Sequence, residues 1–538
     1  MHKGSFPAAP KSLESLVHKA IGSTPELMAG RVAKTPDAPF LHWSGRKVTF
    51  SEAQDLIQRL ATYINQFIKD ESELRVAGYL SNCPEAVISW LGTHTANAVY
   101  VALNRSHCGI LLDDILARSR PTILITESSA ISDLPTDLSK YGVESVIFID
   151  KINKDLKDFG VSEVVSFTDA TARTSNLEIL PSAHDLATIM FTSGTTGPSK
   201  AVCIPHGMLV RGGARVAEAL GYASDDVFHG YLPQFHIVSH LHMILGMVVA
   251  GGSVALFPSF SLSRFWREVE QVGCTIFSGL PFQVSLFLEG EPSKNDRNHT
   301  LRFGLVGPQP SPEIRVKFEQ RFGIQLRDTY GMTEIEPLTL PIPGQYQPLG
   351  SCGKANPDFE LAILDQDGWH VAVGEKGELV ARPLIPSIMT QGYLDDPEST
   401  LKLFKNLWLY TGDLAKFDKD GWYYILGRIK HMIRRRGENI SAWELEKILL
   451  LHPEISKCEA VGVPSRLGEE DVKIAVVLTE GAELTPIDIH KWCAKKMAKF
   501  MIPRYIEIRD FMPLTDLGKV SKKELQNILN ETWDSENI

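Results

Sequence analysis

The sequence predicts an α/β fold, in which a large N-terminal domain holds mainly parallel sheets and a small, mobile C-terminal domain is α+β. Short apolar runs that have the composition of buried strands alternate with segments of helical spacing, and this alternation is typical of parallel sheets. The C-terminal part repeats the mixture as a self-contained pattern of domain size. A chain of 538 residues also exceeds one ordinary hydrophobic core, so at least two domains are expected.

A helix, a hairpin and a capped helix come first. Leu13–Ala20 has helical spacing, and a hairpin is predicted from Phe40–Trp43 and Lys47–Phe50. Ser51, with Asp55, indicates the capped start of the next helix. The next elements are strands at Val76–Leu80, Val99–Ala102, Pro121–Ile125 and Val143–Ile149, a helix at Pro84–Asn97, and an irregular surface connection at Asp150–Pro181.

The middle of the chain continues this alternation. Its most apolar window, Leu241–Phe257, is interrupted by Gly246, Gly251 and Gly252, so it indicates a buried helix followed by a strand rather than a membrane span. The expected strands are Leu186–Phe191, Ala201–Pro205, Val227–Leu232, Val254–Phe257, Arg302–Val306, Gln325–Thr329 and Gly421–Gly427. The expected helices are His206–Leu220, one from near Ile237 and one from Ser311 or Pro312.

The domain boundary is predicted at Lys430, which separates residues 1–429 from residues 430–538. Ser441 and Glu444 have the spacing of a capping box for a helix that ends near Leu450. The elements expected after it are strands at Cys458–Val463, Lys473–Leu478 and Tyr505–Ile508, and helices at Pro486–Ala498 and Lys522–Asn530.

The composition excludes several classes of protein. An apolar share of 43% and a charged share of 22% are those of an ordinary globular protein rather than a disordered one. A net charge of −10 argues against nucleic acid or an anionic membrane as the main partner. The seven cysteines have no C-x-x-C spacing and indicate neither a disulfide framework nor a zinc site, so a cytoplasmic location is expected. No secretory signal or S-K-L ending is visible.

A loop rich in glycine and hydroxyl side chains follows the predicted strand Leu186–Phe191. Thr192–Lys200 reads TSGTTGPSK, and its glycines, hydroxyls and lysine together suit an anion such as phosphate. The Walker A spacing is absent. The alternative is a flexible surface turn, since the same residue types are common in turns.

Further candidates each have a plain structural alternative. His236 lies at a strand end, where open α/β sheets bind ligands, or it is a core or capping histidine. Tyr330–Glu334 offers an aromatic face for a purine and a carboxylate for Mg²⁺, or it is a β-turn. Asp413, at a predicted turn, suits a ribose diol. Lys519 is a solvated charge or a cation that reaches the site, and the basic run Arg428–Ile440 is a weak candidate for nucleic-acid binding in an acidic chain.

Taken in order, these motifs resemble those of the adenylate-forming superfamily, which comprises acyl-CoA synthetases, luciferases and adenylation domains. The set is Thr192–Lys200, Pro233–His236, Tyr330–Glu334, Tyr410–Asp413, Gly427–Ile440 and Gly518–Lys519, and it spans nearly the whole chain. GRIKHMIRRRGENISAWELE, KFMIPRYIE and the Phe265-Trp266 pair look most like the crotonobetaine/carnitine-CoA ligase group. The resemblance implies an AMP-forming acid–thiol ligase that uses ATP, Mg²⁺ and CoA to convert a carboxylic acid, through an acyl-adenylate, to its CoA ester.

The resemblance also implies a role for each matching residue. The ATP phosphates are expected to be held by Thr192, Ser193, Gly194, Thr195, Thr196, Gly197 and Lys200, and Mg²⁺ by Thr192 and Glu334. The rest of the nucleotide is expected to contact Gly307, Pro308, Asp328, Thr329, Tyr330, Gly331, Met332, Thr333, Asp413, Ile425 and Arg428. Lys430 is the expected hinge, Lys519 bridges the acyl carboxylate and the α-phosphate, and Gly437, Glu438 and Asn439 border the thiol tunnel. The expected acid pocket comprises Phe235, the gate His236, Val238, Ser239, Gly279, Val306, Gly307 and Met332, and the expected catalytic set is Lys519, Lys200, His236, Thr333 and Glu334.

Two departures from the family pattern leave the acid unnamed. The phosphate loop ends in Gly197-Pro198-Ser199-Lys200, where proline and its neighbour are exchanged although the lysine stays in register. Val306–Gln309 replaces a common Gly-Gly-Ala-Pro stretch, and the mostly apolar pocket candidates include no obvious cage for a quaternary ammonium. The alternatives are an enzyme that loads a separate carrier protein and a non-catalytic nucleotide-binding relative. Neither nucleic acid nor an integral membrane is an expected partner, and a homo-oligomer is left open.

Overall fold

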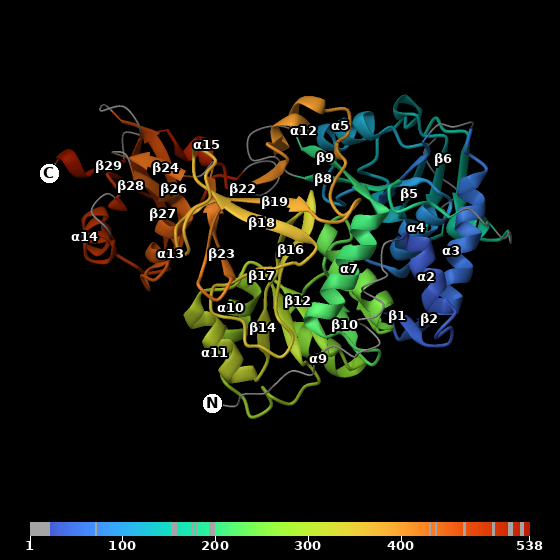
Figure 1. The fold of residues 1–538 in the computed structure, drawn as a ribbon, viewed down its shortest axis with the longest axis horizontal. Coiled ribbons are helices and arrows are strands. Elements are labelled where there is room, and N and C mark those ends of the chain that lie inside the picture. The colour runs from blue at the N-terminus through green and yellow to red at the C-terminus, as the bar shows by residue number, and fades with distance from the viewer. Residues whose placement is uncertain are drawn as a thin grey trace. The chain divides into compact units, whose positions relative to one another are not determined.

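The computed structural model of the protein describes residues 22–69, 73–151, 159–173, 177, 180–192, 199–429, 432–435, 438–465, 470–497, 501–514, 520–527 and 532–537. The chain divides into two compact units (Figure 1). The first comprises Met1–Leu361, Ala381–Leu409 and Gly421–Tyr423, and the second comprises Ala362–Val380, Tyr410–Asp420 and Tyr424–Ile538. The predicted helix Leu13–Ala20 and the predicted hinge Lys430 lie outside the described residues, so the boundary at Lys430 stays a prediction.

An eight-stranded sheet in the first unit carries the predicted phosphate loop. Its strands lie in the order β20 (Gly392–Tyr393), β9 (Lys200–Pro205), β8 (Leu186–Thr192), β4 (Val99–Ala102), β3 (Arg75–Tyr79), β5 (Ile123–Thr126), β6 (Ser145–Phe148) and β7 (Glu163–Ser166). The strands from β8 to β7 are parallel, whereas β9 and β20 add an antiparallel edge. The strands predicted for this part of the sequence are confirmed.

The irregular connection predicted over Asp150–Pro181 is wrong for part of that segment. Glu163–Ser166 form β7, which pairs in parallel with β6, and the short helix α6 (Phe167–Ala170) follows it. Glu163 and Val164 are exposed, because β7 is the outer strand of the sheet. An edge strand of this kind lacks the continuous apolar run by which buried parallel strands are found in a sequence.

A second, seven-stranded sheet in the same unit is parallel except at one edge. Its order is β14 (Gln325–Arg327), β13 (Phe303–Val306), β12 (Ile276–Gly279), β10 (Val227–Gly230), β11 (Ser253–Leu256), β1 (Pro39–Trp43) and β2 (Arg46–Thr49). The predicted hairpin is confirmed, since β2 pairs antiparallel with β1, which in turn lies parallel to β11.

The cap predicted at Ser51 is wrong by two residues. Helix α3 (Phe50–Asn65) has Thr49 as its N-cap, whose hydroxyl accepts from the Glu52 N–H at 3.1 Å. The Glu52 carboxylate in turn accepts from the Thr49 N–H at 2.8 Å. This pair has the three-residue spacing of a capping box, whereas Ser51 and Asp55 are four residues apart.

A third sheet begins at the predicted adenine motif. In the first unit, β15 (Tyr330–Met332), β16 (Ile335–Leu340) and β17 (Gly353–Ala355) are antiparallel neighbours, and β17 pairs with the start of β23 (Trp422–Arg428). The short β21 (Phe404–Lys405) pairs with the first residues of β22 (Trp408–Phe417). The second unit holds the remaining parts of β23 and β22, the residues Gly377–Val380 of β19 (Gly377–Pro383) and the residues Ala362–Leu364 of β18 (Phe359–Leu364).

Two site motifs therefore differ from their predicted local structure. Tyr330–Met332 form a strand themselves rather than a turn at the end of a strand, and only Thr333 and Glu334 make the turn into β16. Asp413 lies inside the ten-residue strand β22 rather than at a turn. The turn was expected because glycine precedes it, and Gly412 does have a positive φ of 72° within the strand.

Helix α7 (His206–Leu220) is the buried centre of the first unit (Figure 1). Its arginines Arg211 and Arg215 both pair with the buried Asp358, each at 2.6 Å, so the charges that α7 brings inside are neutralised. The other helical segments of this unit are α2 (Thr24–Val32), α4 (Pro84–Thr95), α5 (Ile110–Ser119), η1 (Ser128–Ala130), η2 (Ser139–Tyr141), η3 (Ser239–Leu245), α8 (Gly246–Ala250), α9 (Leu262–Val272), α10 (Pro281–Glu289), α11 (Pro312–Phe322) and α12 (Pro397–Leu403).

The apolar window Leu241–Phe257 has the predicted form. It contains most of η3, which is a π-helix, then α8 and β11. Among the described residues, no helix is both long and apolar enough to cross a membrane.

The second unit contains the C-terminal elements in their predicted order. A four-stranded sheet has the order β26 (Ile455–Pro464), β27 (Glu470–Leu478), β28 (Tyr505–Ile508) and β29 (Trp533–Asp534), and the helices are α13 (Ala442–Leu449), α14 (Pro486–Lys496), α15 (Lys522–Leu525) and η6 (Ser535–Asn537). The sequence reading missed β29 and the hairpin of β24 (Met432–Arg435) and β25 (Glu438–Ser441). The side chains of the predicted capping pair, Ser441 and Glu444, lie outside the described residues.

Candidate active site

The described ends of the phosphate loop lie side by side on β8 and β9. Thr192 and Lys200 are opposite each other in the antiparallel register, and the Thr192 hydroxyl donates to the Lys200 carbonyl at 3.4 Å. Ser193–Pro198, which include the predicted phosphate ligands Ser193, Gly194, Thr195, Thr196 and Gly197, lie outside the described residues. The two ends of the loop are therefore joined, as a compact anion-binding loop requires.

Arg118 of helix α5 contacts the chain at both ends of the phosphate loop. Its Nη1 donates to the Ser199 carbonyl at 2.7 Å, and its guanidinium lies 5.3 Å from the ring centre of Phe191. One side chain thus contacts the residue before Thr192 and the residue before Lys200.

A single tyrosine connects the predicted phosphate lysine with the predicted magnesium carboxylate. The Lys200 ammonium lies 4.4 Å from the ring centre of Tyr393. The Tyr393 hydroxyl donates to Glu334 Oε1 at 2.6 Å. Tyr393 is 8% exposed and Glu334 is 6% exposed, so the hydrogen bond between them is shielded from solvent, while Lys200 is half-buried. The structure thus gathers Lys200, Glu334 and the hairpin end at Thr192, which are far apart in the sequence.

The predicted adenine motif is fixed by close backbone packing. Tyr330 N–H donates to the Thr339 hydroxyl at 3.2 Å, and Tyr330 is half-buried. At Gly331, a Cβ atom would lie within 3.0 Å of three atoms of Glu336. Only glycine fits there without a shift of β15 against its neighbouring strand.

One carboxylate oxygen of the buried Asp328 has no donor among the described residues. Asp328 is 4% exposed, and the oxygen is Oδ1. Burial raises the pKa of this carboxyl group well above its usual range. Gly307 lies beside it, since a Cβ at that position would be 2.7 Å from Oδ1. An unmatched acceptor next to a glycine is a suitable site for the exocyclic amine of a purine.

The backbone around Asp328 is held by Gln347. Gln347 Oε1 accepts from Asp328 N–H at 3.0 Å, and Gln347 Nε2 donates to the Asp328 carbonyl at 3.0 Å. A second amide, Gln309, donates to the Ser351 carbonyl at 2.6 Å. Gln309 belongs to the segment that replaces the common Gly-Gly-Ala-Pro. Its hydrogen bond therefore attaches this segment to Ser351, just before β17.

The predicted acid-pocket residues fall into two groups. Gly279 and Val306 are opposite each other on β12 and β13. Phe235, His236 and Val238 lie between β10 and η3, and Ser239 is the first residue of η3, where its hydroxyl donates to the Pro233 carbonyl at 2.7 Å. His236 is exposed, and its ring contacts that of Phe235 at 4.4 Å. The buried core alternative for His236 is thus wrong, and its role as a gate stays a prediction.

The predicted ribose pair is present within the second unit. Arg428 Nε lies 2.9 Å from Asp413 Oδ1, and Arg428 Nη1 donates to the Thr411 carbonyl at 2.8 Å. Asp413 is 5% exposed. The backbone between them is anchored, because the Gly412 N–H donates to Glu378 Oε1 at 2.9 Å. Asp413 thus presents a carboxylate in a fixed direction.

Several predicted site residues cannot be compared with the structure. Lys430, Gly437 and Lys519 lie outside the described residues. Glu438 and Asn439 belong to β25, but their side chains are not described. The predicted hinge, thiol tunnel and bridging lysine therefore stay predictions.

Family models and known relatives agree with the order of these motifs. Residues 28–394 match the model of the AMP-binding enzyme, and residues 444–519 match that of the AMP-binding enzyme C-terminal domain. The chain belongs to the AMP-binding enzyme family. Crotonobetaine/carnitine–CoA ligases of Salmonella typhimurium and Escherichia coli O1:K1 are 32% identical to this AMP-binding enzyme, over 84% of its chain and 88% of theirs. The predicted superfamily and the predicted class, an AMP-forming acid–CoA ligase, are confirmed.

Solved structures give the same fold for this AMP-binding enzyme. ATP-bound MatB from Rhodopseudomonas palustris has a TM-score of 0.80 at 24% identity, covering 93% of this chain and 98% of its own. O-succinylbenzoate CoA synthetase from Bacillus subtilis, in complex with AMP, has a TM-score of 0.79 at 24% identity, with 94% and 99% covered. The predicted fold class, a large domain with mainly parallel sheets and a small α+β domain, is confirmed.

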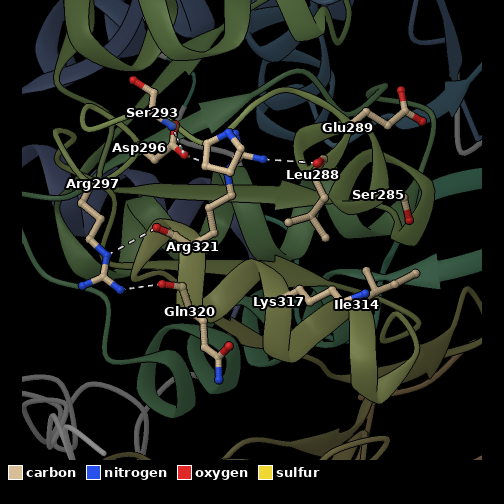
Figure 2. A pocket seen from close by; sticks show the side chains of 11 residues that line it. Ser285, Leu288, Glu289, Ser293, Asp296, Arg297, Ile314, Lys317, Gln320 and Arg321 are labelled. Carbon is tan, nitrogen blue, oxygen red and sulfur yellow. Dashed lines mark hydrogen bonds and ion pairs between the residues drawn. The ribbon is translucent and has the colours of Figure 1, made fainter.

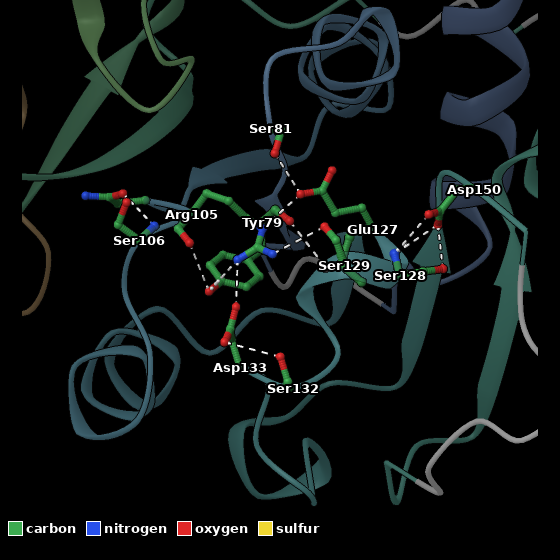
Figure 3. Close-up of polar contacts among 12 residues, drawn as sticks. Tyr79, Ser81, Arg105, Ser106, Glu127, Ser128, Ser129, Ser132, Asp133 and Asp150 are labelled. Carbon is green, nitrogen blue, oxygen red and sulfur yellow. Dashed lines mark hydrogen bonds and ion pairs between the residues drawn. The ribbon is translucent and has the colours of Figure 1, made fainter. Parts of the chain in front are cut away.

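Two other polar regions of this AMP-binding enzyme are already neutralised by their own residues. An open groove of about 810 Å³ lies along α10 and α11 (Figure 2), where Arg321 donates to Asp296 at 2.7 Å and to backbone carbonyls, and Lys317 pairs with Glu313. At the carboxyl ends of β4 and β5 (Figure 3), Arg105 pairs with Glu127 and with Asp133, each at 2.9 Å. We assign neither region to the nucleotide.

The sequence reading missed three residues that hold the site. Tyr393 and Gln347 contact predicted site residues, and Arg118 contacts Ser199 of the phosphate loop, yet none of the three belongs to a motif that was singled out. The available signal for Tyr393 was weak, a glycine–tyrosine pair before a helix with Asp396 as its N-cap. Their roles follow from strand pairing, which a single sequence does not give.

Proposed function

We propose that this enzyme activates a carboxylic acid at the site built around Lys200, Tyr393 and Glu334. One acid oxygen attacks the α-phosphorus of ATP, and the bond to pyrophosphate breaks, which gives the acyl-adenylate. The CoA thiolate then attacks the acyl carbon, and AMP leaves. The observation that carries the proposal is the contact of one tyrosine with both the phosphate-loop lysine and the predicted magnesium carboxylate.

Charge stabilisation is the main task of the side chains in the first step. Phosphoryl-type transfers need little covalent help from a protein, so positioned cations account for most of the effect. Lys200 offsets negative charge on the β- and γ-phosphates, and Thr333, in the turn after β15, contacts the α-phosphate. The carboxylate of Glu334 is buried together with Tyr393, whereas Lys200 is half-buried.

The residues present fit Mg²⁺. A carboxylate has about four acceptor positions, and Tyr393 uses one of those on Glu334. Mg²⁺ typically takes one or two carboxylates and keeps several waters. Glu334 and the Thr192 hydroxyl would hold the ion, which supplies charge neutralisation between the phosphates when bound. Among the described residues, no group of three or more acidic, histidine or cysteine side chains forms a denser metal site.

Adenosine is bound by two sets of residues. Asp328 accepts from the adenine amine while Tyr330 stacks on the ring, and Gly307 leaves room for both. Asp413 accepts from the ribose hydroxyls, and Arg428 holds its carboxylate in place.

The bridging lysine of the first step and the residues of the second step are assigned from the resemblance alone. Lys519 bridges the acyl carboxylate and the α-phosphate, the small domain turns at Lys430, and Gly437–Asn439 border the thiol path. Replacing Lys519 by alanine is expected to reduce adenylation far more than thioesterification of supplied acyl-adenylate. Equal losses in both half-reactions would contradict this division of labour.

The acid is proposed to have an uncharged and mainly apolar body. The pocket candidates Phe235, Val238, Gly279, Val306 and Met332 are apolar or lack a side chain. The relatives named above act on crotonobetaine or carnitine, but these residues offer neither a carboxylate nor an aromatic cage for a trimethylammonium group. Crotonobetaine is therefore expected to be a poorer substrate than an uncharged acid of similar length.

A pyrophosphate-release assay over short, medium and aryl acids tests the proposal. At least one acid is expected to release pyrophosphate in proportion to enzyme, and Lys200→Ala is expected to abolish the release. Lys402→Ala is the matched control, because Lys402 is exposed on α12 and pairs with the exposed Glu398. Nucleotide binding without release on any acid would favour the non-catalytic alternative.

Three further points rest on separate measurements. Turnover with free CoA is expected to exceed turnover with a phosphopantetheinylated carrier protein, and the reverse would favour the carrier-loading alternative. A cytoplasmic location is proposed because none of the seven cysteines, all of them among the described residues, forms a disulfide. Light scattering would decide between a monomer and a homo-oligomer.

A further inference from the structure

The strand that carries Tyr393 is held from two directions. Gly392 and Tyr393 form β20, which pairs with Cys203 and Val202 on β9, the strand that begins at Lys200. The Tyr393 N–H donates to the Thr400 hydroxyl at 2.9 Å. The position of the tyrosine is thus determined by the same strand that positions the lysine.

The residues before Tyr393 also contact the Glu334 backbone. Thr390 N–H donates to the Glu334 carbonyl at 2.7 Å, and the Thr390 hydroxyl donates to the Cys203 carbonyl at 2.8 Å. Gly392 has a φ of 116°, and a Cβ there would lie 2.6 Å from a methyl carbon of Thr400. This segment therefore links the turn at Glu334 to β9 through the main chain as well as through the side chain.

The two contacts of Tyr393 act on opposite charges. Its hydroxyl donates to a carboxylate, a charge-assisted hydrogen bond that is stronger and more directional than one between neutral groups. Its ring face lies under an ammonium group, which the negative face of the ring attracts. One rigid side chain thus sets the distance between a cation and an anion that would otherwise move on long, flexible stems.

We propose that Tyr393 is a positioning residue that fixes Lys200 and Glu334 relative to each other before MgATP binds. This inference rests on the proposed function, in which the lysine meets the phosphates and the carboxylate meets the ion. Without Tyr393, Lys200 and Glu334 would pair with each other or turn to solvent, and each ATP molecule would have to separate or reorder them. The phenol itself contacts no reacting atom.

Two substitutions separate the two contacts. Tyr393→Phe removes the hydrogen bond to Glu334 and keeps the ring under Lys200. Tyr393→Leu removes both contacts. Tyr63→Phe is the matched control, because Tyr63 is buried to a similar degree and donates to the carboxylate of Glu163 at 2.8 Å, away from the site.

The readout is equilibrium binding of ATP, by calorimetry without acid or CoA, over a series of Mg²⁺ concentrations. Tyr393→Phe is expected to raise the Mg²⁺ concentration for half-maximal ATP affinity about tenfold, the order of one hydrogen bond to a charged group. ATP binding without Mg²⁺ is expected to stay unchanged in Tyr393→Phe and to weaken in Tyr393→Leu. In turnover, the KM for MgATP is expected to rise by a larger factor than kcat falls.

The outcomes separate this inference from the proposed function. If Tyr393→Phe binds MgATP as the wild type and Tyr63→Phe do, the inference is wrong. It is equally wrong if Tyr393→Phe loses binding only in proportion to a lowered melting temperature. If the wild type shows the expected magnesium dependence but releases no pyrophosphate with any acid, the proposed function fails while the role of Tyr393 stands. A Tyr393→Leu protein that does not fold leaves the decision to Tyr393→Phe.

Discussion

Arg118 Nη1 donates to the carbonyl oxygen of Ser199 at 2.7 Å, which ties helix α5 to the C-terminal base of the phosphate loop. The same guanidinium lies over Phe191, at the other base of the loop. Neither contact involves a predicted phosphate ligand. The shape of the loop base is therefore determined in part by a helix that lies about 80 residues away in the sequence.

Arg118→Ala is expected to raise the KM for ATP about tenfold and to change kcat less. A hydrogen bond from a charged donor contributes roughly 1.5–3 kcal/mol, and its loss leaves the loop base less ordered before ATP binds. Steady-state kinetics at saturating acid and CoA measures both constants.

Arg120→Ala is the control for this prediction. Arg120 lies at the end of the same helix, but its pair with Asp395 is exposed on both sides, and such pairs contribute little. A KM that rises equally in both variants would show that loss of positive charge, rather than the contact with Ser199, is responsible.

Gly307→Ala is expected to weaken ATP binding by at least tenfold while the protein stays folded. A Cβ atom there would lie 2.7 Å from Asp328 Oδ1, so the carboxylate must turn away from the position proposed for the adenine amine. Calorimetric titration with ATP measures the affinity, and circular dichroism checks the fold.

The control for Gly307→Ala is Gly30→Ala. Gly30 lies in helix α2, and a Cβ atom there would meet nothing within 4 Å. That change is expected to leave ATP affinity unaltered and to stabilise the helix slightly. Unaltered ATP affinity in Gly307→Ala would contradict the proposed adenine site.

Local signals in the sequence predicted most elements of this fold. Helix α7 was predicted with its correct bounds, because a proline precedes it and Gly221 ends it in the left-handed conformation. The outer strand β7 was missed because exposed residues interrupt its apolar pattern. Asp413 was predicted at a turn after the short apolar run Leu407–Leu409, although the strand continues through Gly412 on both sides.

The site was predictable only where its residues form motifs. Lys200, Glu334, Asp413 and Arg428 stand in recognisable runs, whereas Tyr393 acts through its pairing with β9, nearly 200 residues earlier. A single sequence carries no information on such register. Nor does the sequence show that Asp328 Oδ1 is buried without a donor, since the residues next to Asp328 in the chain do not reveal which groups surround it in the fold.

Asp413→Asn is expected to remove the preference of the enzyme for a complete ribose. In the wild type, a deoxyribose analogue that lacks the 2′- or the 3′-hydroxyl should bind more weakly than ATP, because Asp413 is then left buried beside Arg428 without its diol. In the variant, ATP and the analogue should bind about equally. Competition binding with both nucleotides measures the ratio.

Asp418→Asn provides the comparison for the ribose prediction. Asp418 follows β22 in the same unit and accepts from the Tyr424 hydroxyl at 2.9 Å. Its substitution should keep the wild-type ratio between ATP and the deoxy analogue. A wild type that binds both nucleotides equally well would remove Asp413 from the nucleotide site.

Acid pH is expected to destabilise the first unit through its buried histidines. Burial lowers the pKa of His206 to about 4 and that of His240 to about 3. An unfolded histidine takes up a proton near pH 6.5, whereas these folded ones stay neutral. Above about pH 6.5 the two histidines are neutral in both states and do not lower the free energy of unfolding. As the pH falls from there toward 4, the unfolded chain takes up protons that the folded protein does not, and the free energy of unfolding decreases. The free energy of unfolding, measured by urea denaturation between pH 7.5 and 4.5, should fall along this window.

His240→Phe tests which histidine matters. His240 stacks on Trp90 at 3.9 Å between ring centres, and neither ring nitrogen has a hydrogen-bond partner among the described residues. Phenylalanine keeps the stacking and removes two unsatisfied polar atoms, each of which costs about 1–3 kcal/mol when buried. The variant should therefore be more stable at pH 7.5, and its advantage should grow at pH 5 because it has no imidazole to protonate on unfolding. A variant with the same advantage at both pH values would assign the acid sensitivity to His206 and the neighbouring His94 instead.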